Sequence, residues 1–237
     1  MATGERTILR ATIGAFAATF LILGSATLAA QQPAASVGVA AKPYPIQSDQ
    51  RKTLSRDYAK LHYGIDEWRL VDPEMIIVHF TGSDSDEASL TVFKSASLGD
   101  TRPDIVAGGA LNVGIHYVVW RDGTLWSLMP ETDMARHAAG FNHVALGIEM
   151  TGSSAAKLTE AQLVSCAALV ADIVRRNPSV KYLCGHHEYV QKGRAHLALY
   201  RELMKDYPPP VKIDPGDAFM SQLRAVLNTR YSLSLSD

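Results

Sequence analysis

The sequence predicts an α/β fold, in which a single domain has a central mixed β-sheet flanked by helices. Two observations lead to this fold class. Short apolar runs rich in β-branched residues recur along the chain, and segments with a helical spacing of apolar residues lie between them. The 237-residue chain is 47% hydrophobic, which is too apolar for a disordered protein.

Composition limits the classes of function. The chain carries 23 Lys and Arg against 24 Asp and Glu, a formal net charge of −1, so it has no basic field that would attract nucleic acid. Its 2 cysteines cannot make an all-thiolate zinc site, because such a site takes about four. Any metal site must therefore use the 8 histidines and the carboxylates.

The first element along the chain, residues 1–30, is predicted to be a secretory signal peptide. Arg6 and Arg10 precede an uncharged run, Ala11–Leu28, which is followed by two alanines and a polar stretch. The alternative is an uncleaved membrane anchor, because the run approaches the length that spans a bilayer. Its many Ala, Gly and Thr residues make it weakly apolar and favour cleavage. The protein is therefore expected to be exported, to the periplasm or the cell envelope.

A tether and one folded domain are expected to follow. Residues 31–47 mix Pro, Ala and Gln without periodicity, which is typical of a flexible tether, and the domain is predicted to extend over residues 48–237. In an oxidising compartment Cys166 and Cys184 have two alternatives, a disulfide bond or a pair of buried free thiols. The sequence does not give their separation, so both alternatives stay open.

The N-terminal half of the domain is predicted to hold a helix, a strand and a hairpin. The helix covers Ser48–His62, whose first residues are good N-caps. Glu74–Thr81 is an apolar run rich in β-branched residues and is expected to form a buried strand. In Ile115–Met129, two aromatic-rich strands flank Asp122 and Gly123, a dipeptide typical of a tight hairpin turn.

The C-terminal half is predicted to alternate strands with helices. Apolar strands are expected at Val144–Met150 and Val180–Cys184, and an amphipathic helix at Asp217–Arg230. Another helix is expected at Thr159–Arg176, because Thr159 and Gln162 have the spacing of a capping box.

Three distant segments supply candidate metal ligands. His79 interrupts an apolar strand, and a lone histidine there is more often a core residue. His186 and His187 directly follow a strand, and only one of them can face the same ion as His79, because successive residues point to opposite faces. Asp214 precedes a Pro-Gly turn. Two imidazoles and one carboxylate, with water as the fourth ligand, are typical of catalytic zinc.

Two further charged residues suit a hydrolase. Glu149 lies in an apolar strand, where a buried carboxylate is costly unless it is paired or used in catalysis; the alternative is an ion pair with an arginine such as Arg136. Lys212 precedes Asp214 by two residues, so in an extended segment both side chains leave on the same side. Its ammonium could stabilise an oxyanion, and the alternative is a solvated loop lysine.

Five segments together resemble the type 2 N-acetylmuramoyl-L-alanine amidase family, which includes bacterial cell-wall amidases, phage lysozyme-type amidases and peptidoglycan-recognition proteins. They are IIVHFTGS, VGIHYVVWRDGTLWSLMPE, RHAAGFNHVALGIEMTG, CGHHEYV and KIDPGDAF. They follow the family's order and cover roughly Glu74 to Arg230. The resemblance implies a zinc hydrolase that cuts the amide between the lactyl group of N-acetylmuramic acid and L-alanine of the stem peptide.

The resemblance also implies roles for individual residues. The ligands of one Zn²⁺ per chain would be His79, His186 and Asp214. Glu149 falls at the position of the general base, and Lys212 at the lysine of the family's K-x-D signature. The segment that lines the substrate groove contains His137 and Asn142, which are therefore expected to bind substrate.

The chain departs from the family pattern at two places. An insertion at about residues 191–210 is expected to form an extra helix and a Pro-rich loop beside the groove. Ile115 stands where some phage-type members carry a tyrosine, which places more weight on Glu149 as the base, and His116 is expected to be a core residue.

The resemblance implies peptidoglycan or muropeptides as the partner, and we expect the protein to be a monomer. Nucleic acid is excluded as a partner, and a membrane is expected to be contacted only through the N-terminal segment, if that segment stays uncleaved. The alternative function is a non-catalytic module that binds peptidoglycan or muropeptides, because relatives that have lost a ligand bind without cutting.

Overall fold

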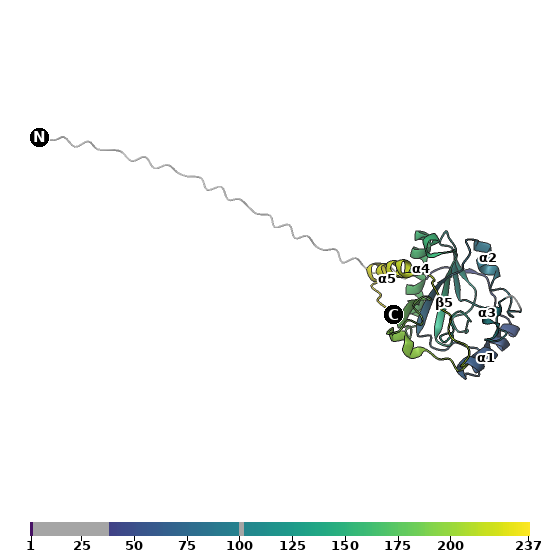
Figure 1. Cartoon of the computed structure of the whole chain (residues 1–237). Coiled ribbons are helices and arrows are strands. Elements are labelled where there is room, and N and C mark those ends of the chain that lie inside the picture. The colour runs from purple at the N-terminus through teal and green to yellow at the C-terminus, as the bar shows by residue number, and fades with distance from the viewer. Residues whose placement is uncertain (2–37, 100–101) are drawn as a thin grey trace. The chain divides into compact units, whose positions relative to one another are not determined.

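A six-stranded mixed sheet forms the centre of the computed structural model, which describes Met1 and residues 38–99 and 102–237 (Figure 1). Apart from Met1, the predicted signal peptide lies outside the described residues, and so does the first part of the predicted tether. Within the described ranges, no helix combines the length and apolar character needed to cross a membrane.

The strand order is β1-β4-β3-β5-β2-β6. Strands β3, β5, β2 and β6 run parallel, β4 runs antiparallel to β3, and β1 runs parallel to β4. The six strands are β1 Lys42–Pro43, β2 Met75–Phe80, β3 Tyr117–Val119, β4 Leu125–Ser127, β5 Ala145–Met150 and β6 Tyr182–Gly185. The predicted mixed sheet is thus confirmed, including the hairpin between β3 and β4.

Two long helices cover one face of the sheet. Helix α4 (Glu160–Arg176) begins with the predicted capping box of Thr159 and Gln162, and helix α5 (Asp217–Tyr231) follows the last loop. Because side chains alternate along a strand, every second residue of the central strands points at these helices and builds the main core. Members of this core from β2 and β5 are Ile76, Val78, Leu146, Ile148 and Met150.

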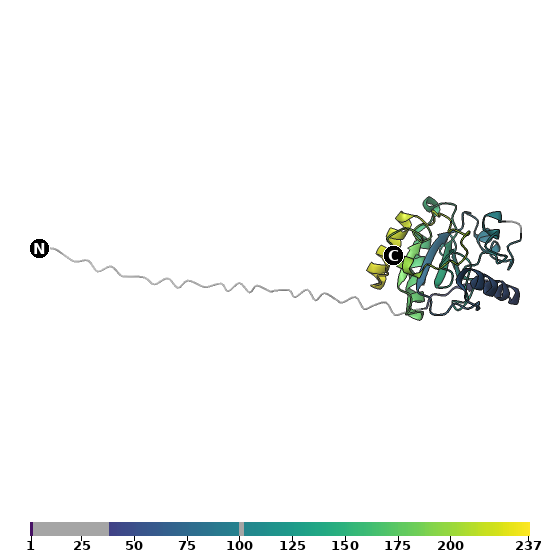
Figure 2. The same ribbon diagram turned by 60° about the horizontal axis from the view of Figure 1, so that its bottom comes forward.

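Helix α1 (Asp49–Tyr63) lies on the other side of the sheet from α5 (Figure 2). Ser48 caps its start by accepting from the Arg51 amide, and Gly64 ends it in the left-handed conformation at a φ of 65°. The same face of the sheet carries the alternate side chains of β2 and β5, His79 and Glu149 among them, so the polar residues lie opposite the main core.

The folded domain begins earlier than predicted. Residues 42–43 form β1, and beyond it the amides of Tyr44 and Ile46 donate to the carbonyls of Ser127 and Leu128, at 2.9 and 3.0 Å. Ile46 is only 5% exposed. The predicted end of the tether at residue 47 is therefore wrong. A two-residue edge strand containing proline is too short to produce a periodic pattern.

The sequence does not predict the shorter helices. They are α2 Asp86–Thr91, α3 Pro103–Val106 and the 3₁₀ helices η1 Ala155–Lys157 and η2 Ala195–Leu199. In the insertion at residues 191–210, the expected extra helix is only η2, and the rest is irregular. Hydrogen bonds to other segments fix this insertion, because Arg201 and Leu203 donate from their amides to the carbonyls of Gly140 and His62.

Both cysteines are free and buried, as one of the two alternatives expected. Cys166 belongs to the main core beneath α4, whereas Cys184 on β6 packs with Met75 and Ile77 on the opposite face. The sheet therefore separates the thiols. Burial raises the pKa of Cys166 to about 12, which keeps that thiol protonated and unreactive.

Candidate metal centre

Three predicted ligands meet at one point, although they come from distant parts of the sequence. Nδ1 of His79 lies 2.9 Å from Nδ1 of His186, which lies 3.0 Å from Oδ2 of Asp214. The third side of this triangle, from His79 Nδ1 to Asp214 Oδ2, is 3.4 Å. All three residues are buried.

Each ligand is held by a different element. His79 lies on β2 next to Glu149 of β5 in the parallel register, and His186 continues β6 by donating its amide to the carbonyl of Val78 at 3.0 Å. Asp214 is held by His187, whose amide donates to the Asp214 carbonyl at 2.7 Å. Of the two adjacent histidines, His186 faces the centre, and the ring of His187 contacts Asp217 instead.

The donor set fits a zinc ion. A tetrahedral ion with bonds of about 2.1 Å separates its ligand atoms by about 3.4 Å, close to the sides of this triangle. Burial lowers the pKa of His186 to about 3. Burial alone would raise the pKa of Asp214, but a hydrogen bond that its carboxylate accepts from His186 outweighs burial and holds this pKa well below its usual range. Metal ligation requires this combination of neutral imidazole and ionised carboxylate.

Glu149 lies beside the ligands on the neighbouring strand and is 8% exposed. Burial, and then the negative charge of Asp214, raise the pKa of Glu149 well above its usual value, and the positive charge of Lys212 opposes them. Among the described residues, no hydrogen bond or ion pair engages its carboxylate, and Arg136 donates to three backbone carbonyls and to Tyr207 instead. Glu149 is therefore a buried acid without a structural partner.

Lys212 is half-buried on the loop that carries Asp214. It alternates with Val211 and Ile213, which are 89% and 76% exposed, so the lysine and the aspartate leave the loop on the inner side. The ammonium acts electrostatically on both Glu149 and His186. This position brings a positive charge near the three ligand atoms.

The two residues expected to bind substrate have different surroundings. His137 lies next to the centre, because its Nδ1 is 3.0 Å from Nε2 of His79. Asn142 is fully buried; its Oδ1 accepts from the amides of His137 and Ala138, and its Nδ2 donates to the Tyr63 hydroxyl at 3.0 Å. Substrate contact by Asn142 does not fit this position, and we correct that expectation: Asn142 holds the loop that carries His137.

His116 is a core residue, as expected, and has no exposed surface. Its Nε2 donates to the Asp133 carbonyl and its Nδ1 accepts from the Gly147 amide, at 2.9 and 3.0 Å. Ile115, which stands at the family's tyrosine position, is also fully buried. The contact between His137 and His79 has no signal in the sequence, because no spacing rule relates a loop to a strand 58 residues away.

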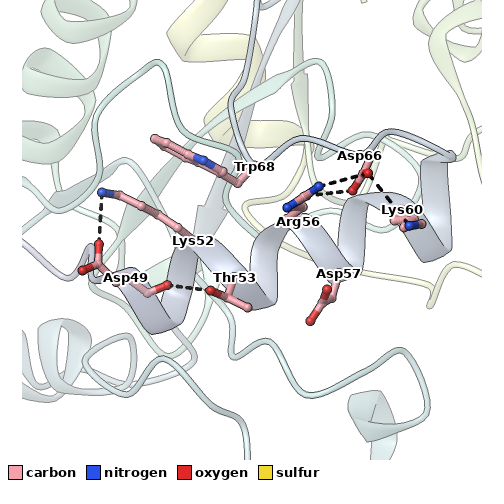
Figure 3. A pocket seen from close by; sticks show the side chains of 8 residues that line it. All are labelled: Asp49, Lys52, Thr53, Arg56, Asp57, Lys60, Asp66 and Trp68. Atoms are coloured by element: carbon pink, nitrogen blue, oxygen red, sulfur yellow. Dashed lines mark hydrogen bonds and ion pairs between the residues drawn. The ribbon is translucent and has the colours of Figure 1, made fainter.

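Two surface hollows lie apart from the three ligands. A hollow of about 300 Å³ is lined by residues of η1, α4 and α5. A larger one, of about 530 Å³, runs along α1, and Figure 3 shows its side chains paired with one another: Lys52 with Asp49, and both Arg56 and Lys60 with Asp66. None of the predicted site residues lines either hollow. Paired charges of this kind are typical of a solvated helix face.

Comparisons with known proteins agree on one family and one fold. A family described as N-acetylmuramoyl-L-alanine amidase matches residues 69–216, more than half of the chain. The chain is 32% identical over 99 residues to the endolysin of Escherichia phage T7 and 31% identical over 99 residues to that of Enterobacteria phage T3. Each match covers 39% of this chain and 65% of the endolysin, so the chain spans just under two thirds of these relatives.

Among solved structures, the crystal structure of a selenomethionine derivative of AmpD has a TM-score of 0.51. The likeness covers 80% of this chain and 97% of that one, at 20% sequence identity. At this identity the likeness concerns the fold alone.

Proposed function

The chain belongs to the N-acetylmuramoyl-L-alanine amidase family of type 2, and on that premise we propose that it is a zinc-dependent peptidoglycan hydrolase. Its substrate bond is the amide between N-acetylmuramic acid and L-alanine of the stem peptide. One observation carries the proposal: three donor atoms of His79, His186 and Asp214 converge beside the buried carboxylate of Glu149, which has no hydrogen-bond or ion-pair partner in the part of the chain that the structure describes. Perturbed acids beside a ligand cluster are typical of catalytic sites.

Zinc would be held by His79, His186 and Asp214, whose mutual distances suit tetrahedral coordination. When bound, zinc supplies a Lewis acid that polarises the amide carbonyl and makes water a nucleophile near neutral pH. Its double positive charge exceeds the single negative charge of Asp214. The site therefore favours the negative charge that develops on the carbonyl oxygen.

Glu149 moves the proton. Its carboxylate accepts a proton from the attacking water and then donates it to the leaving nitrogen of L-alanine, so that the amide becomes a carboxylic acid and an amine. Burial makes Glu149 a better base than an exposed glutamate, because it raises the pKa of the carboxyl group. With zinc held by the three ligands, the neighbouring positive charge would favour the ionised form of the Glu149 carboxyl group.

Lys212 stabilises the oxyanion. Its ammonium leaves the loop on the same side as Asp214 and is close enough to act on Glu149 and His186. A fixed positive charge directed at a developing oxyanion lowers the energy of the transition state more than that of the substrate.

Digestion of purified muropeptides and of whole sacculi tests the proposal. Mass spectrometry is expected to find free stem peptides that begin with L-alanine, together with glycan that has lost its peptides. Addition of a chelator should stop the release, and zinc should restore it. Release of shortened stem peptides or of sugars would place the cut at a different bond and contradict the proposal.

The same experiment distinguishes the alternative of a non-catalytic binding module. A binding module would sediment with the sacculi and release no stem peptide, with or without zinc. A competent carboxylate at position 149 beside three intact ligand positions favours the hydrolase.

We further propose that the protein is exported and acts in the periplasm or the cell envelope. The order of features in residues 1–30 supports this location, since a basic start, an apolar run and small residues are typical of a signal peptide. Fractionation of cells followed by N-terminal sequencing tests it. A mature chain that begins near residue 30 in the periplasmic fraction is expected, and an intact chain in the cytoplasm would contradict export.

A further inference from the structure

The ring of His137 bridges a backbone carbonyl and the metal ligand His79. Its Nε2 lies 3.2 Å from the carbonyl oxygen of Ala145, the first residue of β5, and its Nδ1 lies 3.0 Å from Nε2 of His79. The two imidazoles are nearly perpendicular, at 84°. A chain of two hydrogen bonds therefore connects the β5 backbone to the ligand.

The carbonyl sets the direction of this chain. A carbonyl oxygen only accepts, so His137 Nε2 must carry the proton of the first bond. The described residues place no carboxylate against the His137 ring, whose partners are a carbonyl and an imidazole. A neutral imidazole has a single proton, and with that proton on Nε2 the Nδ1 of His137 is an acceptor. His79 must then donate from Nε2.

A proton on Nε2 decides what His79 offers at its other nitrogen. The neutral ring holds one proton, so Nδ1 has a free lone pair. Nδ1 is the atom that faces His186 and Asp214 in the ligand triangle. The opposite tautomer would place a hydrogen on that atom and block the site.

The surroundings of His137 hold its ring in this place. Asn142 accepts from the His137 amide at 2.8 Å and is itself anchored by the hydroxyl of Tyr63. The ring lies against Gly147 of β5, where an added Cβ would stand 2.9 Å from His137 Nδ1. Glycine at this position therefore leaves the space that the imidazole occupies, and the loop and the strand together determine the orientation of the ring.

We propose that His137 is a positioning residue, which fixes His79 in the tautomer that presents Nδ1 to the metal. This inference rests on the proposed function for the identity of the ion, zinc, whereas the tautomer itself follows from the hydrogen bonds. Loss of the hydrogen-bond partner of a ligand histidine typically lowers metal affinity by about 10–100-fold, so removal of the His137 ring should weaken zinc binding by that factor.

Zinc affinity of variants is the first part of the test. His137→Phe keeps an aromatic ring and removes both hydrogen bonds, so its zinc dissociation constant should rise by about 10–100-fold in competition with a chromophoric chelator. His137→Gln can accept from His79 and donate to Ala145, and it should restore most of the affinity. The matched control is His143→Phe, because His143 lies on the same segment and its ring packs on Tyr63, away from the ligands.

Nitrogen NMR of the metal-free protein is the second part, and it does not depend on zinc or on activity. The imidazole nitrogen shifts of His79 should report a proton on Nε2 in the unmodified protein and a mixture of tautomers in His137→Phe. If His137→Phe does not fold, the spectrum of the unmodified protein still decides. A proton on Nδ1 of His79, or unchanged zinc affinity in a folded His137→Phe, would overturn the inference.

The two proposals fail in distinguishable ways. A protein with the expected tautomer and zinc affinities but no release of stem peptide would contradict the proposed function and leave the role of His137 intact. A protein that cleaves muropeptides normally after His137→Phe, with unchanged zinc affinity, would contradict the role of His137 alone.

Discussion

At the scale of single residues, the surroundings of Glu149 follow from its cross-strand neighbours in the sheet. The parallel register places it between His79 of β2 and Val118 of β3, and Val118 is opposite Trp126 of β4. Side chains in one row share a face, so the carboxylate has an imidazole on one side and apolar surface on the other. This setting explains why Glu149 is buried and has no ion-pair partner among residues 38–99 and 102–237.

Glu149→Gln should abolish most of the amidase activity while zinc stays bound. The amide keeps the size of the side chain but cannot accept a proton, and loss of a general base costs about 10²–10⁴-fold in rate. Stem-peptide release and zinc content are measured on the same sample. Glu160→Gln, at an exposed position at the start of α4, is the control and should match the unmodified protein. Near-normal release by zinc-loaded Glu149→Gln would assign the base elsewhere.

Lys212→Met should lower kcat by about 10²–10³-fold with a small change in KM, as expected for a charge that acts on the transition state. Methionine keeps much of the length of the side chain and removes the charge. Lys205→Met is the matched control, because Lys205 is exposed on the preceding irregular segment. A rise in KM at constant kcat would instead make Lys212 a substrate-binding residue.

The candidate residues of the site could be predicted from the sequence one by one, but the hydrogen bonds that connect them could not. His79 and Glu149 are noticeable in the sequence because each interrupts an apolar strand, and His186 and Asp214 because each follows or precedes a defined turn or strand. The roles of His137 and Asn142 depend on contacts between a loop and two other elements. Such contacts follow from packing, which leaves no periodic trace in the sequence.

At the scale of elements, β1 shows why boundaries are harder to predict than helices and strands. A strand is predicted from alternation over several residues, and residues 42–43 are too few to alternate. Helices α1 and α4 have 15 and 17 residues and side-chain N-caps, and the sequence predicts both to within one residue at each end. The irregular segments between them fold through side-chain contacts with backbone, such as the five carbonyls that Arg51 binds.

Ile46→Ala tests whether the fold begins at β1. Ile46 is 5% exposed and packs in the cluster around Met129 and Val118, so its truncation should lower the free energy of unfolding by about 2–5 kcal/mol. Val211→Ala, at 89% exposure, should have almost no effect. Chemical denaturation of both variants provides the measurement. Equal stability of the two would support the original prediction of a tether up to residue 47.

Glu131 connects the end of the β3–β4 hairpin to the end of α4. Its carboxylate accepts from the Tyr117 hydroxyl and the Asn177 amide, both at 2.7 Å, and pairs with Arg176. Burial would raise the pKa of Glu131, but these hydrogen bonds outweigh it and lower the pKa below its usual value. The ionised form is thus the one that the fold stabilises.

Acid should therefore weaken this connection. Because the folded pKa is lower than the unfolded one, the contribution is complete above an unfolded pKa of about 4.3 and is lost as the pH falls through the folded value. Glu131→Gln should be about 1–3 kcal/mol less stable than the unmodified protein at pH 7, and the difference should shrink below about pH 4. Denaturation at several pH values measures it, with the exposed Glu87→Gln as control. A difference that grows in acid would contradict the sign.

At the scale of the whole molecule, the metal centre joins segments that are far apart in the chain. His79 is the residue before the last in β2, His186 follows β6, and Asp214 precedes α5, so 107 positions separate the first two ligands. The unfolded chain cannot hold three donors at this spacing without losing much conformational entropy. An ion that binds the centre consequently favours the folded chain over the unfolded one.

Zinc should thus raise the melting temperature by an amount that grows with the logarithm of its affinity. At a free concentration about 100 times its dissociation constant, a ligand specific for the folded state adds about 2.7 kcal/mol. For a domain of this size that corresponds to a rise of about 5–10 °C. Asp214→Ala removes the anionic member of the His79, His186 and Asp214 triangle and should abolish the rise, whereas Asp206→Ala, exposed in the neighbouring insertion, should keep it. Thermal denaturation with and without zinc measures all three proteins. An equal rise in Asp214→Ala would mean that zinc stabilises the fold from another place, because without the carboxylate the triangle retains only two of its three donors.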